Sequence, residues 1–373
     1  MSRSLCKYCG KLKLPKLQYQ IGQSSITESK FMDEDFLARH RSTLVVGSAG
    51  WLTEQLEKRG IRYFVLPTLR REISPCCDFA ALWHLRRIIK EYQPNLVHCH
   101  SSKAGLLGRI AAWSLGVPAV FTVHGWAFTE GVVPMKRRIY ERIEWIGGFF
   151  SQRIICVSEY DCKLGMSTLR RHREKMVTIY NGVSEEAPVY MDVLRESLHL
   201  VMVARFSQPK AQGEVLQALF RLNECGIKVH VDFVGDGDEL ASVRQLAERL
   251  SLSDQVRFLG SQMHVENLLP EYDGFLLISR WEGFPISILE EMRAELPIIT
   301  SDVGGVCEEV LHGKTGLLVQ RDSVDDLTEK LRYAAEHREV FRDMGRAGRK
   351  RFLENFTTDK MMERIMSAYE EFR

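Results

Sequence analysis

The feature that most constrains the fold of this chain is a repeated alternation of short apolar runs with amphipathic helical segments. In the helical segment over residues 78–94, Asp78 can cap the start and Pro94 stops the helix. Apolar runs without polar alternation are typical of parallel strands that helices cover on both faces. The first half predicts strands over residues 42–47, 61–67, 95–100, 118–125, 153–158 and 175–183. The second half predicts strands over residues 198–205, 228–237, 256–260, 274–279, 297–301 and 316–320.

This pattern predicts an α/β protein with two doubly wound, Rossmann-like domains. The 373 residues exceed the usual size of one domain, and the pattern restarts after a junction near residues 183–197. In open parallel sheets, ligands bind beyond the carboxyl ends of the strands. We therefore expect two domains that face each other across a ligand-binding cleft.

The net charge of +2 hides an asymmetry between the two halves. Residues 1–183 carry 28 Lys and Arg against 15 Asp and Glu, whereas the remainder carries 23 against 34. The basic half indicates an anionic partner, although solvated helix faces would give the same counts. No nucleic acid is expected, because the basic residues are not interleaved with stacking aromatics. An anionic membrane surface or a phosphate-bearing substrate fits better, and residues 85–90 and 135–142 are candidate membrane contacts.

The sequence indicates a cytoplasmic protein that contacts the cytoplasmic membrane face peripherally. No apolar run reaches the roughly 18 to 20 residues that a membrane span needs. The N-terminal residues are basic but lack the apolar core of a signal peptide, so none is expected. Among nine cysteines, Cys99 and Cys156 lie inside apolar strand-like runs, which favours reduced, buried thiols over disulfides.

The stretch SRWEGFPISILEEM, residues 279–292, carries the first candidate site. Glu282 follows a predicted strand, Gly283 shapes the turn, and Glu290 lies about two turns into the next helix, leaning back toward its start. Carboxylates in these positions can accept hydrogen bonds from sugar hydroxyls, and the helix start can hold a phosphate. Acids there also complement the helix dipole without any ligand. Glu291, one residue further round the helix, is expected to be solvated.

Two further loops carry residues that suit a phosphate ligand. Arg205 and Lys210 follow the predicted strand over residues 198–205. An Arg binds phosphate oxygens bidentately and a Lys supplies a point charge, so the two can converge on one diphosphate. Gly304 and Gly305 follow another predicted strand, where backbone N–H groups can approach an anion, although a plain turn would use the same residues.

Together these motifs resemble the family 4 glycosyltransferases, which have the GT-B fold and retain the configuration of the donor sugar. The order R-x4-K, E-G-F-P-x4-E and G-G-V-x-E looks like the C-terminal half of that family, from about residue 198 to 355. The runs VHCHSSKAGLLGRIAA, FTVHGWAF and IICVSEYD look like its N-terminal half in members that build bacterial surface polysaccharides. The resemblance implies an acceptor-side domain over residues 1–183, a nucleotide-sugar-binding domain over residues 184–355, and a helix over residues 356–373 that packs back on the first domain.

The resemblance also implies roles for individual residues. Arg205 and Lys210 would bind the diphosphate of a nucleotide-sugar and stabilise it as it leaves, which would be the main catalytic contribution. Glu290 would bind the ribose hydroxyls. Glu282 would contact the donor sugar, with the backbone amides around Gly283 close to it.

Three more residues near the donor sugar follow from the same resemblance. Gly304 and Gly305 would lie near the sugar or the phosphate, as would the backbone amide of Phe284. His124, at the end of the predicted strand over residues 118–125, would face the cleft near the reacting side of the sugar.

The implied reaction needs no cofactor, because the nucleotide-sugar is itself a substrate. A UDP-sugar is expected rather than a GDP-sugar, and the transferred group would be a hexose or an N-acetylhexosamine. The acceptor would be a lipid-linked sugar or a glycan. The product would be a surface polysaccharide, such as a capsule, an O-antigen or an exopolysaccharide.

Two motifs compete with a metal-independent mechanism. Residues 236–238 and 33–35 read D-x-D, which holds a divalent metal in transferases of the GT-A type. Asp236 also fits a Gly-flanked turn that is part of the resemblance. Cys6 and Cys9 form half of a zinc motif, and no second C-x2-C exists in the sequence. We therefore expect no metal.

Residues 1–42 depart from the family pattern. Family members begin with an apolar strand and a Gly-Gly loop on the acceptor side, but here only Gly22 follows a conceivable strand over residues 17–21. The acceptor loop is then either built differently or no longer functional. Two alternatives to a transferase follow: a nucleotide-sugar epimerase of the same fold, or a degenerate transferase that binds nucleotide or a partner without turnover.

Overall fold

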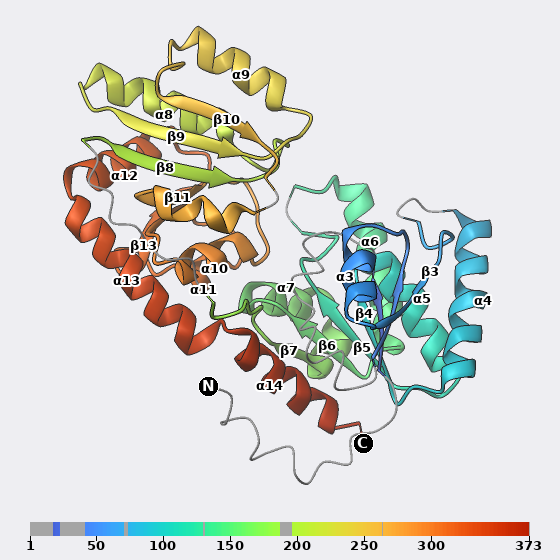
Figure 1. The fold of residues 1–373 in the computed structure, drawn as a ribbon. Helices are drawn as coiled ribbons and strands as arrows, with labels where there is room; N and C mark the ends of the chain where they lie inside the picture. Colours follow the sequence, from blue (N-terminus) through green and yellow to red (C-terminus); the bar gives the residue numbers. More distant parts are fainter. Residues whose placement is uncertain are drawn as a thin grey trace. The chain divides into compact units, whose positions relative to one another are not determined.

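The computed structural model describes residues 18–22, 42–70, 74–129, 131–186, 196–262 and 264–372. The chain divides into two compact units (Figure 1). Unit 1 comprises Met1–Cys156, Leu164–Val177 and Ala368–Arg373, and unit 2 comprises Val157–Lys163 and Thr178–Ser367. Each unit is built on its own parallel sheet, which confirms the expected α/β class with two Rossmann-like domains. The domain boundaries at residues 183 and 355 stay a prediction.

Unit 1 contains a seven-stranded sheet with the order β3-β2-β1-β4-β5-β6-β7. The short strand suggested by residues 17–21 is present as β1, which pairs in parallel with β2 and β4 near the centre of the sheet. The strand order therefore runs outward in both directions from β1 and β4, which is the doubly wound pattern. The strands are β1 (Gln18–Gly22), β2 (Thr43–Val46), β3 (Arg62–Val65), β4 (Leu96–His100), β5 (Ala119–Val123), β6 (Arg153–Cys156) and β7 (Met176–Thr178).

The helices of unit 1 pack on this sheet, and α5 contacts both α4 and α6. The helices are α3 (Trp51–Lys58), α4 (Pro75–Tyr92), α5 (Ser102–Trp113), α6 (Pro134–Phe149) and the 3-10 helix η2 (Arg170–Lys175). Helix α7 (Glu159–Thr168) is divided, because its residues up to Lys163 belong to unit 2. Across the described ranges, no helix combines the length and the apolar character that a membrane crossing requires.

Helix α4 begins three residues before its predicted start. The observed first residue is Pro75, whose fixed φ suits the first helical position, and Ser74 occupies the N-cap position. Asp78 still supports this end, because its Oδ2 accepts a hydrogen bond from the backbone N–H of Ser74 (3.1 Å). At the other end Gln93 adopts a left-handed conformation (φ 47°) directly before Pro94, which confirms the predicted stop.

Unit 2 contains a six-stranded parallel sheet with the order β10-β9-β8-β11-β12-β13. Strands β8 and β11 are neighbours although two strands separate them in the chain, so the order reverses between them. The loops that follow β8 and β11 therefore flank a topological switch point, where open parallel sheets bind their ligands. The strands are β8 (Leu198–Val203), β9 (Val229–Val234), β10 (Val256–Gly260), β11 (Gly274–Leu277), β12 (Ile298–Ser301) and β13 (Gly316–Val319).

Between these strands lie α8 (Gln212–Glu224), α9 (Leu240–Arg249), α10 (Ile286–Arg293) and α11 (Val306–Glu309), with the 3-10 turns η3 (Val265–Asn267) and η4 (Leu269–Glu271). After the last strand come α12 (Val324–Glu336), α13 (Arg338–Asn355) and α14 (Thr358–Glu370), and α14 enters unit 1 from Ala368. The cysteines of the described residues are free thiols, and Cys99 and Cys156 are buried as expected.

A fully buried ion pair joins α5 and α6 in unit 1. Arg109 donates from Nη2 to Glu144 (3.0 Å), from Nε to the carbonyl of Gly105 (2.9 Å) and from Nη1 to Ser151 (3.3 Å). A Cβ on Gly147 would lie 2.7 Å from the guanidinium, so a glycine is needed where α6 passes it. The charges of Arg109 and Glu144 compensate each other within the core. Removing either side chain would leave the other charge buried without a counter-charge.

Glu144→Ala is expected to lower the free energy of unfolding by about 3 kcal/mol, because it leaves the Arg109 cation buried without its partner. Arg137→Ala removes the partly exposed Arg137–Glu141 pair of the same helix and should cost less than about 0.5 kcal/mol. Urea unfolding measures both variants. Equal losses would show that burial does not set the strength of the Arg109–Glu144 pair.

Candidate functional site

The loop after β8 holds Arg205 on a closely supported backbone. Phe206 beside it is buried, and the backbone N–H of Phe206 donates to the carbonyl of Asp236 (3.0 Å). In the loop after β9, a Cβ on Gly235 would lie 2.1 Å from a carbonyl oxygen of the β8 loop, and one on Gly237 would lie 2.2 Å from that of Phe206. The V-G-D-G turn therefore fixes the backbone on both sides of Arg205, whose side chain is exposed.

The structure describes only part of the candidate metal motifs. Asp236 takes part in its own turn, because Oδ1 accepts a hydrogen bond from the backbone N–H of Gly237 (2.7 Å). Residues 33–35, Cys6 and Cys9 lie outside the described residues. Within the described ranges, no three His, Cys, Asp or Glu side chains are grouped as metal ligands.

The β8 loop is joined to the end of β11 by backbone and side-chain contacts. The backbone N–H of Ala211 donates to the carbonyl of Ile278 (2.9 Å), and Lys210 forms a β-bridge with Ser279. The ammonium of Lys210 pairs with Oε1 of Glu282, and only 20% and 13% of these side chains are exposed. The structure thus brings together two of the predicted site residues, which come from opposite sides of the switch point.

Arg280 holds this arrangement in place, and the sequence analysis did not identify it. Its guanidinium donates to the carbonyl of Gln208 and pairs with Glu214 and Asp322, each at 3.1 Å. Its backbone N–H donates to the carbonyl of Pro209 (2.8 Å). The position of Arg280, two residues before Glu282, does not predict these contacts, because all partners of Arg280 are distant in the sequence.

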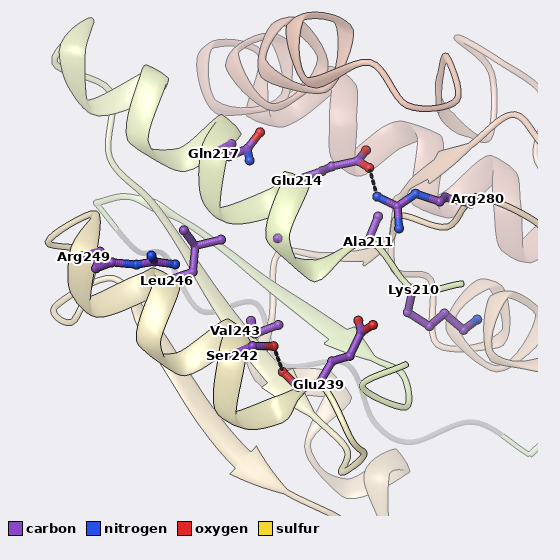
Figure 2. A pocket seen from close by; sticks show the side chains of 11 residues that line it. Lys210, Ala211, Glu214, Gln217, Glu239, Ser242, Val243, Leu246, Arg249 and Arg280 are labelled. Carbon is purple, nitrogen blue, oxygen red and sulfur yellow. Dashed lines mark hydrogen bonds and ion pairs between the residues drawn. The ribbon is translucent and has the colours of Figure 1, made fainter. Parts of the chain in front are cut away.

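A separate pocket of about 370 Å³ lies beside this loop, between α8 and α9 (Figure 2). Its lining includes Glu214, Gln217, Glu239 and Ser242, and the ammonium end of Lys210 points away from the two helices. Neither Glu282 nor Glu290 lines it. Of the predicted site residues, the pocket includes Lys210 alone, together with Arg280 that supports its loop.

The loop after β12 packs backbone to backbone against the loop that carries Glu282. Gly304 has a left-handed φ of +58°, and a Cβ on it would lie 2.0 Å from the carbonyl oxygen of Glu282. The N–H of Gly305 donates to the carbonyl of Gly283 (2.9 Å). The glycine pair therefore has a packing role, and the N–H of Gly305 is already engaged. The predicted proximity of the pair to sugar or phosphate stays a prediction.

Phe284 turns its ring into the core of unit 2. The ring stacks on Tyr180 (centroids 5.3 Å apart) and meets the ring of Phe356 edge-on (5.7 Å). Any contact of Phe284 with a donor would therefore involve its backbone amide, as the resemblance implies, and not its ring.

Helix α10 carries Glu290 and Glu291 in different environments. Glu290 is half-buried, whereas Glu291 is 1% exposed. The expectation that Glu291 is solvated is therefore wrong. Glu291 lies three residues after Ile288 and directly before Met292, both fully buried, so it shares the packed face of the helix.

Two further glutamates lie on α11: Glu308, which ends the G-G-V-x-E motif, and Glu309, which the sequence analysis did not identify. The carboxylate of Glu308 accepts hydrogen bonds from the backbone N–H groups of Glu159 (2.7 Å) and Tyr160 (2.8 Å) at the start of α7. Glu309 is fully buried, and its carboxylate has no hydrogen-bond partner among the described residues. Burial, followed by the charges of Glu282 and Glu308, raises the pKa of Glu309 well above its ordinary value. Burial therefore favours the neutral form of the Glu309 carboxyl group.

In unit 1 the predicted site residue His124 belongs to a buried histidine cluster. Its Nε2 lies 2.9 Å from Nδ1 of His100, and His98 bonds Thr122 (2.7 Å) and the hydroxyl of Tyr369. Burial lowers the pKa of His124 to about 4 and that of His98 to about 3, and also lowers the pKa of His100. The cluster is therefore neutral near pH 7. His124 can donate one hydrogen bond and accept another, but it carries no positive charge.

Gly304→Ala is expected to destabilise the protein by about 3 kcal/mol or more, because it adds a steric clash with Glu282 to a strained φ. Gly313 is a matched control, since its φ is +71° and nothing lies within 4 Å of a Cβ placed there. Gly313→Ala should therefore cost only about 1 to 2 kcal/mol. Urea unfolding compares the two variants, and equal losses would argue against the close loop contact.

The histidine cluster should make the protein less stable as the pH falls from 6.5 toward 4. In this window the unfolded chain protonates histidines that stay neutral when folded, so the unfolded state binds more protons. Each such histidine contributes a slope of about 1.4 kcal/mol per pH unit. When unfolding free energies are measured across this range, the slope for His98→Gln should be shallower by about 1.4 kcal/mol per pH unit, because one proton fewer is taken up on unfolding. An unchanged slope would contradict the buried neutral state of His98.

Two protein-family models match the chain. The model described as "Glycosyltransferase Family 4" matches residues 35–187, and the model described as "Glycosyl transferases group 1" matches residues 194–351. Together they account for most of both units.

Curated relatives match over nearly the whole chain. The chain is 28% identical to an Escherichia coli protein named UDP-Gal:alpha-D-GlcNAc-diphosphoundecaprenol alpha-1,3-galactosyltransferase, over 96% of this chain and 97% of the relative. It is 28% identical to the O-antigen biosynthesis glycosyltransferase WbnH of Escherichia coli, over 84% and 88%. It is 25% identical to the capsular polysaccharide biosynthesis glycosyltransferase CapM of Staphylococcus aureus, over 83% and 84%.

Solved structures match the fold of the whole chain. A glycosyltransferase from Rickettsia africae superposes with a TM-score of 0.81 at 18% identity, covering 96% of this chain and 98% of that one. Anabaena Alr3699/HepE, solved with UDP and glucose, superposes with a TM-score of 0.79 at 20% identity, covering 95% and 99%. At these identities the likeness concerns the fold. With both halves matched by family models and the fold shared, the chain belongs to the family 4, group 1 glycosyltransferases of the GT-B fold, related to bacterial O-antigen and capsule glycosyltransferases.

Proposed function

We propose that this chain transfers a hexose or an N-acetylhexosamine from a UDP-sugar to a lipid-linked or glycan acceptor in surface polysaccharide synthesis. The observation that carries the proposal is the pairing of Lys210 with Glu282, beside the exposed Arg205, at the switch point of the unit 2 sheet. The configuration of the donor sugar is retained, and no metal is required. The named relative that uses UDP-Gal and the HepE complex with UDP and glucose support a UDP-sugar donor.

In this proposal the β8 loop binds the diphosphate. Arg205 grips phosphate oxygens and Lys210 adds a second cation, and both stabilise the negative charge that builds on the departing nucleotide. Because Arg280 and the V-G-D-G turn fix this loop, little reorganisation is needed when the charge develops. Glu290 binds the ribose hydroxyls.

The donor sugar lies next to the loop of Glu282. Glu282 accepts hydrogen bonds from sugar hydroxyls, and backbone amides at Gly283 and Phe284, with Gly304 and Gly305, line the same place. From the acceptor-side domain, His124 acts as a neutral hydrogen-bonding group near the reacting side of the sugar. Its tautomer is coupled to that of His100 through their hydrogen bond.

The acceptor is the less defined substrate. The relative named for a diphosphoundecaprenol acceptor supports a lipid-linked one. The domain assignment then follows, with residues 1–183 facing the acceptor, residues 184–355 binding the donor and residues 356–373 packing back on the first domain. We propose that the basic first domain contacts the cytoplasmic face of the membrane peripherally.

Release of UDP from a panel of UDP-sugars and lipid-linked acceptors tests the activity. Arg205→Ala should lower kcat about a hundredfold or more, because it removes a cation from the developing phosphate charge. Glu290→Ala should mainly raise KM for the donor, since ribose contacts are the same in the ground and transition states. Lys228→Ala, an exposed cation of unit 2 paired with Asp254, is the control and should leave both constants unchanged.

The same assay separates the alternatives. Unchanged turnover in both site variants would refute the site assignment. An isomerised donor sugar formed without acceptor would favour an epimerase. UDP binding by calorimetry, with no product from any acceptor, would favour a non-catalytic transferase.

A further inference from the structure

Helix α6 of unit 1 presents an apolar stripe to solvent instead of to the core. Met135 is 75% exposed and Ile139 is 49% exposed, and they are followed on the same face by exposed large apolar side chains at positions 145, 146 and 149. Met135, Ile139, Ile146 and Phe149 are separated by four, seven and three residues, which places them along one side of the helix, with Trp145 at its edge. At 16 residues, the helix is roughly 24 Å long, so the stripe runs along most of it.

The exposed arginines and the acidic residues of α6 lie on different sides of the helix. Arg138 and Arg142 lie within the exposed stripe. The acids lie elsewhere: Glu144 is buried against Arg109, and Glu141 is half-buried and paired with Arg137. The exposed stripe of α6 is therefore apolar and basic and contains no acid. An ordinary surface helix has the opposite arrangement, with its apolar side facing the core.

A second basic element borders the end of the stripe. The 3-10 helix η2 contacts α6 and exposes Arg170, Arg171 and Arg173, with Glu174 as its one acid. The guanidinium of Arg171 lies over the ring of Phe149, 5.2 Å from its centroid. The basic charge therefore continues beyond the helix, next to its last exposed aromatic residue.

We propose that α6, bordered by η2, is the surface on which this protein docks to an anionic lipid bilayer. A helix with apolar and Arg side chains on one exposed face buries the apolar groups among the lipid headgroups and places the cations at the phosphates. A second copy of the chain is a poorer partner, because pairing two such stripes would bring Arg138 and Arg142 against like charges. A lipid-linked acceptor would bring the enzyme to such a surface, so the biological purpose rests on the proposed function.

The two segments expected to contact the membrane differ in the apolar side chains that they expose. Residues 135–142 lie on α6 and contribute both apolar and basic groups. In residues 85–90 of α4 the apolar side chains Leu85, Ile88 and Ile89 are buried, and only the cations face outward. Within residues 85–90 the exposed side chains are therefore cations alone, although Trp83, just before this segment, is 53% exposed beneath the guanidinium of Arg87.

Co-sedimentation of the full chain with vesicles tests the proposal. The protein should bind vesicles that contain phosphatidylglycerol and should bind phosphatidylcholine vesicles much more weakly. Exchanging both stripe cations (Arg138→Glu with Arg142→Glu) should weaken binding about thirtyfold or more. Exchanging two anchors (Ile139→Asp with Ile146→Asp) should weaken it about tenfold or more even at high salt, where electrostatic attraction is screened.

The matched control places the same change on exposed apolar residues of unit 2. Phe220→Asp with Val340→Asp should bind anionic vesicles as the unchanged protein does. Urea unfolding, with the same transitions in all variants, verifies that they are folded. The proposal is overturned if the unchanged protein ignores anionic vesicles, if the anchor variant binds like the control, or if the α6 variants instead dissociate a dimer. Turnover of a water-soluble acceptor is measured separately, so loss of docking and loss of transferase activity are distinguished.

Discussion

The candidate donor site of unit 2 depends on one backbone contact, between the loop after β12 and the loop after β11. Gly304 lies so close to the carbonyl of Glu282 that no side chain fits between them. This contact fixes the backbone of Glu282, and Glu282 in turn pairs with Lys210. Lys210 belongs to the loop that carries Arg205, and Arg280 holds that loop to the same strand end. The site is therefore preorganised by close packing of backbone and by buried polar contacts, before any ligand is considered.

Buried ionisable groups are accommodated in two ways in this protein. Arg109 and Glu144 are paired with each other, and the remaining donors of the guanidinium find partners. Glu309 is buried without a hydrogen-bond partner among the described residues, and burial raises its pKa. The histidines around His124 follow the second pattern, with pKa values lowered by burial. Burial without a paired counter-charge thus favours the neutral form of these groups, while paired burial fixes helix packing.

The sequence by itself determined the fold class and most strand positions, and it predicted the candidate site residues. Parallel strands covered on both faces are typically apolar runs, so most strands of both sheets could be located from the sequence pattern. Strand β1 at residues 18–22 lacks such a run, and the sequence offered it only as a conceivable strand over residues 17–21. Residues that follow such runs lie at one edge of the sheet. This placed Lys210 near Glu282 although 72 residues separate them. Helix ends were less certain, because the first turn of α4 is set by Pro75 and not by the capping acid.

Only the tertiary structure decided which side of each helix is covered and what each polar group meets. Periodicity shows that two faces differ, but not which face the rest of the protein covers. Glu291 is therefore buried although its neighbour Glu290 is not, and α6 turns its apolar stripe outward because Arg109 and glycines occupy its inner side. The roles of Arg280 and Glu309 depend on partners far away in the sequence. A local pattern cannot identify them, since such contacts exist only after the chain has folded.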